Sequence, residues 1–178
     1  NDSVFIKMPV FESSFKAKVE NGKWEGAWIK GTSGQEQVLP FTAEKDKKRF
    51  NDDGNAKTNI SGRWAVTFAS DKSKVEASIA EFHQTGNKIT GTSLTPTGDY
   101  RYQEGMVSGN KLKPSGCDGG HDFFFIADII INKTIVNGIF FSGAKYKETW
   151  TAVKDPKAKV HTDLAAMFLK PGEEKLNF

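Results

Sequence analysis

The chain has 178 residues, of which 37% are hydrophobic and 26% charged, and its formal net charge is +3. This composition is typical of one globular domain, with or without a tail. No run approaches the roughly 18 apolar residues that span a bilayer, so we expect no membrane-spanning segment. The excess positive charge is dispersed and almost all lysine, whereas nucleic-acid surfaces concentrate basic residues and favour arginine, so we expect no nucleic-acid partner.

The first part of the chain has the two-residue periodicity of β-strands. Apolar residues alternate with other residues over 4–10, 15–19 and 24–28. The second and third runs flank Asn21-Gly22, a pair that is typical of a tight hairpin because both central residues of such a turn need a positive φ. A further strand is expected over Gln37 to Ala43.

A long polar segment follows, over residues 44–59. Its basic cluster, Lys45 to Arg49, also holds Asp46, and Asp52 and Asp53 follow it. This mixture of charges favours a solvated loop over a phosphate-binding site. Alternation resumes over residues 64–68, which predicts the next strand.

The second half of the chain contains a loose repeat of about 22 residues. Gly86-Asn87-Lys88 recurs as Gly109-Asn110-Lys111, and more loosely as Asn132-Lys133. Two strands of about ten residues and two turns fill such a period, with the second turns near residues 97–99 and 115–120. These features predict an all-β domain over residues 1–155, an antiparallel meander that curls on itself into a barrel or a curled sheet.

Two regions depart from this pattern. The apolar runs 123–126 and 129–131 break the alternation, which is expected where a loop, a terminus or a partner covers the outside of a barrel strand. Residues 156–178 form a linker or tail. Within it, Thr162 or Asp163 could cap a short helix over Leu164 to Lys170.

The residues that could carry chemistry are few. No phosphate-binding loop, dinucleotide fingerprint, zinc-protease motif or serine-hydrolase motif is present, and no cofactor is expected. His83, His121 and His161 lie far apart, so we expect no metal site. The single cysteine, Cys117, excludes an internal disulfide. His121 nearby could make the Cys117 thiol reactive, or the segment is a glycine-rich turn that leads into a strand.

Two aromatic groups leave alternatives open. Tyr100, Arg101 and Tyr102 are consecutive on one expected strand, so at least one of them points into the barrel. An inward Arg101 would need a carboxylate or an acidic ligand, and the alternative is an outward, solvated arginine. The four tryptophans line a ligand pocket or close the end of the barrel: Trp24, Trp28, Trp64 and Trp150.

Several stretches, taken in order, resemble the N-terminal region of envelope TlpA-like thiol-disulfide oxidoreductases. The stretches are Asp2-Ser3-Val4, Met8-Pro9-Val10-Phe11, Pro40-Phe41-Thr42-Ala43, Ile60-Ser61-Gly62-Arg63-Trp64, Gly86 to Tyr102, Cys117-Asp118-Gly119-Gly120-His121, Trp150-Thr151-Ala152-Val153, Phe168-Leu169-Lys170-Pro171-Gly172 and Leu176-Asn177-Phe178. The resemblance covers nearly the whole chain. It implies a lipocalin-like β-barrel, further strands upstream, and a tail that leads toward a thioredoxin-like domain.

The Cys-x-x-Cys of that family is absent, so the resemblance assigns no catalytic residue to this chain. It implies a non-catalytic recognition module in the periplasm or cell envelope, which binds a substrate protein or presents it to the redox domain. An exposed sheet edge would suit strand addition or a homo-oligomer. The expected contact region is the barrel end that holds Cys117 and His121 and the neighbouring Tyr100, Arg101 and Tyr102. The alternative is a stand-alone carrier of a small apolar ligand.

Overall fold

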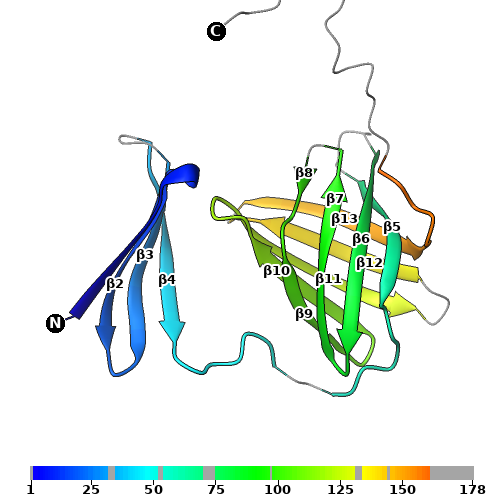
Figure 1. Ribbon diagram of the computed structural model, residues 1–178, viewed down its shortest axis with the longest axis horizontal. Helices are drawn as coiled ribbons and strands as arrows, with labels where there is room; N and C mark the ends of the chain where they lie inside the picture. The colour runs from blue at the N-terminus through cyan, green and yellow to red at the C-terminus, as the bar shows by residue number, and fades with distance from the viewer. Residues whose placement is uncertain are drawn as a thin grey trace, which may run out of the picture.

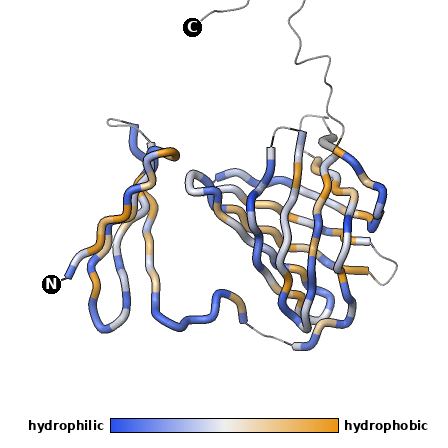
Figure 2. Tube along the Cα trace, in the orientation of Figure 1, coloured by the Kyte–Doolittle hydropathy of each residue, from blue (hydrophilic) through white to orange (hydrophobic). Residues whose placement is uncertain are grey.

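The structure, a computed structural model, describes residues 2–31, 35–51, 54–69, 75–96, 98–130, 134–143 and 145–160. The predicted helix over Leu164 to Lys170 lies outside these ranges. Within them the chain forms two antiparallel sheets, one before and one after the polar segment 45–61 (Figure 1). Apolar and polar residues alternate along the strands of both sheets (Figure 2).

The first sheet is a meander whose strands follow one another in space as in sequence. Its elements are β1 (Asp2–Met8), the 3-10 turn η1 (Pro9–Phe11), β2 (Ser13–Glu20), β3 (Lys23–Lys30) and β4 (Gln37–Glu44). The predicted turn joins β2 to β3, with Asn21 at φ 49° and Gly22 at φ 76°. Both residues are left-handed, as this turn demands, and Gly22 has no Cβ to strain.

One face of this sheet is apolar. The pairings β1–β2, β2–β3 and β3–β4 place Ile6, Phe15, Trp28 and Leu39 in a row across the four strands. The ring of Phe15 lies 5.7 Å from that of Trp28, and Trp28 and Ala17 are buried. These four strands form a sheet of their own, separate from the sheet of the barrel.

The second sheet is the barrel. Its strands are β5 (Gly62–Ala69), β6 (Val75–Thr85), β7 (Lys88–Thr95), β8 (Gly98–Asp99), β9 (Gln103–Ser108), β10 (Lys111–Cys117), β11 (Asp122–Ile130), β12 (Thr134–Ser142) and β13 (Tyr146–Lys154). The two-residue strand β8 pairs with the C-terminal end of β7. The other eight described strands pair with their neighbours in sequence, and β13 pairs with β5, which closes the ring. The expected lipocalin-like antiparallel barrel is therefore present, and it closes without any strand from outside this chain.

The repeat of about 22 residues corresponds to hairpins at one end of the barrel. Gly86-Asn87 turns β6 into β7, and Gly109-Asn110 turns β9 into β10. The third unit, at Asn132-Lys133, falls between β11 and β12 but lies outside the described residues. The repeat therefore marks every second turn of an up-and-down barrel, because strands that alternate in direction return to the same end.

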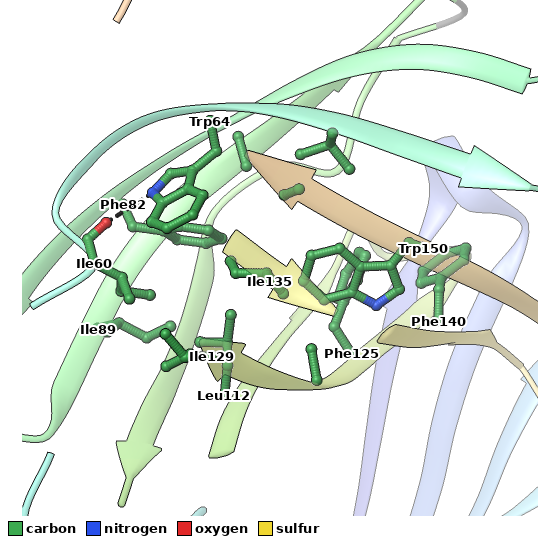
Figure 3. Packing of buried hydrophobic residues seen from close by; sticks show 14 of the residues in the cluster. Ile60, Trp64, Phe82, Ile89, Leu112, Phe125, Ile129, Ile135, Phe140 and Trp150 are labelled. Atoms are coloured by element: carbon green, nitrogen blue, oxygen red, sulfur yellow. Dashed lines mark hydrogen bonds between the residues drawn. The ribbon is translucent and has the colours of Figure 1, made fainter. Parts of the chain in front are cut away.

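Aromatic and branched side chains fill the barrel (Figure 3). At the hairpin end, Trp64 is 1% exposed and donates from its indole N–H to the Ile60 carbonyl at 2.8 Å. The Ile60 N–H in turn donates to Oε1 of Gln84 at 2.8 Å. Buried Ile60 and Trp64 thus close this end. The expectation holds for Trp64 alone, since Trp150 lies within the barrel core and Trp24 and Trp28 belong to the first sheet.

The apolar run 123–126 keeps its alternation in the structure. Phe123 and Phe125 are buried in the core, whereas Phe124 faces outward and stacks on Phe141, with ring centroids 6.2 Å apart. Phe124 and Phe50 border the same small hollow on the outer wall. The polar segment 45–61 is also held there, because the guanidinium of its Arg49 donates to the Ser115 hydroxyl at 2.6 Å. A loop, one of the three expected coverings, therefore lies beside this outer surface, but Phe124 remains 38% exposed.

Candidate functional site

The two sheets meet at the open end of the barrel, opposite Trp64. The Ser13 hydroxyl donates to the Gly119 carbonyl at 2.9 Å, and the Phe11 ring lies against Gly119 and Gly120. In Figure 1 the turn between β10 and β11 accordingly points at η1. This contact brings the β3 and β4 ends of the first sheet over the barrel mouth.

A cleft of about 980 Å³ lies between the sheets, and we call it the mouth cleft. Its floor is aromatic and belongs to the barrel, and its other wall is polar and comes from the first sheet. The floor is formed by Tyr100, Phe123, Phe140 and Tyr146, and the facing wall by Lys30, Gly31, Gln35 and Gln37. The remaining described residues that border the cleft are Thr95, Gly98, Asp99, Asp118, His121, Ser142, Gly143 and Lys145.

Tyr100 separates the cleft from the barrel core. Its ring lies 4.8 Å from that of Phe123, 5.2 Å from Phe140 and 5.7 Å from Phe125, measured between centroids. Below it the Phe125 ring meets Trp150 edge-on at 5.8 Å. The inward residue of the 100–102 segment is thus the tyrosine, and the rings beneath it belong to the core rather than to the cleft.

The two acidic residues at the cleft are already paired. Asp118 accepts from the N–H groups of Gly120 at 2.7 Å and His121 at 2.6 Å, and its other oxygen lies 3.1 Å from Nδ1 of His121. Asp99 accepts from the Arg101 N–H at 2.8 Å and lies 3.6 Å from Nε of that arginine. Both carboxylates therefore already have partners within the chain.

The two lysines at the cleft are different. Among the described residues, no carboxylate lies within ion-pair distance of Lys30 or Lys145. The ammonium of Lys30 sits over the indole of Trp28, 4.7 Å from the ring centroid, which restrains it at the rim. With Arg101, which pairs with Asp99, three cationic and two anionic side chains among the described residues therefore lie in or beside the cleft.

The predicted contact residues divide between the cleft and the surface. Tyr100 and His121 border the cleft, and the His121 ring stacks on Phe123 at 6.1 Å. Cys117 is exposed, and its sulfur accepts from the Gly119 N–H at 3.3 Å. Arg101 and Tyr102 are also exposed, so the outward arginine was the correct alternative. The reactivity of Cys117 stays a prediction.

Sequence reasoning missed the lysines and most of the aromatic floor. Phe123 and Phe140 look like ordinary core residues in the sequence, and Tyr146 carries no motif. Lys30 is one of 25 basic residues, and its place at the cleft depends on how the first sheet docks. The only available signal was positional, since strand ends of an up-and-down barrel that share a direction meet at one end.

Over the described ranges, no three His, Cys, Asp or Glu side chains come together as metal ligands would. Within the same residues, no helix has the length and apolar character needed to cross a bilayer. These findings leave the mouth cleft as the feature on which a function can be argued.

The contact between the sheets depends on Gly119. Its φ is +99°, and a Cβ built there would lie 2.5 Å from the Phe11 ring, whereas one on Gly120 would lie at an ordinary 3.4 Å. We expect Gly119→Ala to separate the sheets and to raise the radius of gyration in small-angle X-ray scattering. Gly120→Ala is the matched control and should leave it unchanged. Equal radii in the two variants would contradict this role.

The turn at Asp118 should be sensitive to acid. Burial raises the pKa of Asp118, but the hydrogen bonds from Gly120 and His121 outweigh it and hold the pKa below the usual 3.8. A lowered pKa gives stability that is present above the unfolded-state value and lost as pH falls through the folded value.

The destabilisation caused by Asp118→Asn should therefore be clear at pH 6 and shrink below about pH 4. Thermal unfolding of both proteins at the two pH values measures this difference. The pKa values of Glu104 and Asp128 are also lowered. Both residues are present in the unsubstituted protein and in Asp118→Asn, so their effects on stability cancel in the difference. A difference that does not depend on pH would show that the Asp118 carboxylate has no such role.

Comparison with protein-family models, curated proteins and solved structures found no match to this chain.

Proposed function

We propose that this chain is a non-catalytic recognition module that holds an extended polypeptide segment in the mouth cleft. The observation that carries the proposal is a cleft of about 980 Å³ walled by both sheets, with an aromatic floor that rests on a filled barrel. An open cleft of this kind can take a segment of a longer chain, because its ends are free to leave on either side. Aromatic side chains also give a large contact area at a low cost in conformational entropy.

The resemblance to envelope TlpA-like thiol-disulfide oxidoreductases supplies the context of the proposal. In that context the module acts in the periplasm or cell envelope, and a thioredoxin-like domain supplies the redox chemistry. The chain itself contributes binding, since its single cysteine cannot form a Cys-x-x-Cys pair. Thiol labelling of the natural protein tests this context. We expect reduction to make two additional thiols available for labelling. A natural protein with one thiol in total would contradict this context.

A carrier of a small ligand is the second candidate. The observation in its favour is that three buried polar atoms in the barrel have no hydrogen-bond partner among the described residues: Ser78 Oγ, Gln103 Nε2 and Trp150 Nε1. A ligand held inside the barrel could satisfy them. The ring of Tyr100 and its four aromatic neighbours occupy the route to these atoms from the mouth, which favours recognition at the cleft instead.

The test compares binding of labelled unstructured peptides with binding of a fluorescent fatty-acid analogue. Ser142 borders the cleft, so Ser142→Trp should fill it and abolish the rise in peptide anisotropy. Thr151→Trp is the control, because Thr151 is exposed on the neighbouring strand β13. Saturable binding of the fatty-acid analogue with quenched tryptophan emission, and no peptide binding, would overturn the proposal in favour of the carrier.

A further inference from the structure

The charges and the floor of the mouth cleft together specify one kind of segment. Resting on the proposed recognition of a polypeptide, we propose that the cleft selects segments in which aromatic residues are next to acidic residues.

The floor selects a ring. Tyr100, Phe123, Phe140 and Tyr146 contribute their side chains to the cleft, and Phe140 and Tyr146 meet edge-on with centroids 6.1 Å apart. Tyr146 is 50% exposed and Tyr100 is half-buried, whereas Phe123 and Phe140 are buried behind them, so an incoming side chain meets mainly the two tyrosine rings. A phenylalanine or tyrosine would therefore gain ring–ring contacts in addition to the burial of apolar area.

The lysines select a carboxylate. Lys30 comes from the first sheet and Lys145 from the turn before β13, so the two cations reach the cleft from different sheets. No carboxylate among the described residues pairs with either of them, whereas Arg63 and Lys88 of the barrel pair with Glu81 and Glu104. A glutamate or aspartate on the bound segment would supply the missing charge.

The acids at the cleft do not select a cation. Asp118 accepts two backbone N–H bonds and lies beside Nδ1 of His121, and Asp99 pairs with Arg101, so a basic segment would meet two lysines and two carboxylates that already have partners. Like charges placed together at an interface oppose binding. The cleft therefore discriminates against basic segments as well as favouring acidic ones.

The test uses three labelled nine-residue peptides of glycine and serine with two inserted pairs: phenylalanine–glutamate, phenylalanine–glutamine and serine–glutamate. We expect the phenylalanine–glutamate peptide to bind about threefold to tenfold more tightly than either of the others. This preference should weaken in 0.5 M salt, where exposed charges are screened beyond about 4 Å.

Substitutions test whether Lys30 and Lys145 cause the preference for glutamate. Lys30→Gln combined with Lys145→Gln should bind the glutamate and glutamine peptides equally. Lys147→Gln combined with Lys157→Gln removes the same charge from exposed positions that do not border the cleft, and it should keep the preference. Equal binding of the two phenylalanine peptides by the unsubstituted protein overturns this inference and leaves the proposed function standing. Failure of every peptide to bind, with or without binding of the fluorescent fatty-acid analogue, overturns both.

Discussion

Replacement of Trp64 by alanine is expected to lower the free energy of unfolding by about 3–5 kcal/mol, because it empties the closed end of the barrel. Trp64 is almost fully buried and belongs to the core cluster (Figure 3). Its loss also leaves the Ile60 carbonyl without the indole donor and removes the contact that holds the 56–61 segment under the barrel. Urea unfolding followed by circular dichroism measures the change.

Trp64→Phe separates the two contributions. It keeps most of the apolar volume and removes only the hydrogen bond to Ile60, so we expect a smaller loss of about 1–2 kcal/mol. If the alanine and phenylalanine variants were equally destabilised, the hydrogen bond rather than the packing would close this end. If neither variant were destabilised, Trp64 would not be part of the core.

Tyr100→Ala is expected to have the second large effect, a loss of about 2–4 kcal/mol together with a change in what the protein binds. The Tyr100 ring contacts those of Phe68, Phe123, Phe125 and Phe140, so its removal opens space between the mouth cleft and the core. An apolar cavity that a side chain leaves can hold an apolar ligand. We therefore expect this variant to bind a fluorescent fatty-acid analogue that the unsubstituted protein does not bind.

Tyr102→Ala is the matched control. Tyr102 is 63% exposed, and a surface substitution of this kind usually changes stability by less than about 0.5 kcal/mol. Binding of the fatty-acid analogue by the unsubstituted protein, at the same affinity as by Tyr100→Ala, would contradict the role of Tyr100 as the ring that separates cleft and core.

Local signals in the sequence were enough to predict the class of the fold. The two-residue alternation, the Asn21-Gly22 turn and the Gly-Asn-Lys repeat each depend on residues close together in the chain. Each has a local physical cause, since strands alternate their side chains and tight turns demand a positive φ. The antiparallel barrel and its hairpins followed from these signals.

The division into two sheets could not be predicted in this way. Residues 4–43 and 64–152 have the same alternation, and nothing local shows that β5 pairs with β13 instead of with β4. Pairing between strands some 80 residues apart is decided by which arrangement closes the ring and buries the core rings. The position of the polar segment 45–61 on the barrel wall, and the role of Arg49 within it, could be interpreted only after that pairing was known.

The same distinction applies to the site. The sequence predicted a turn near residues 115–120 and a strand over residues 100–102 with one side chain pointing inward, and it excluded Cys-x-x-Cys chemistry within this chain. In the structure residues 100–102 connect β8 to β9 and are not part of a strand. Only the tertiary structure decided that Tyr100 is the inward residue and that Lys30 and Lys145 border one cleft. The physical reason is that local patterns set the direction of each side chain, whereas a cleft between two sheets exists only once Phe11 and Ser13 have packed against Gly119.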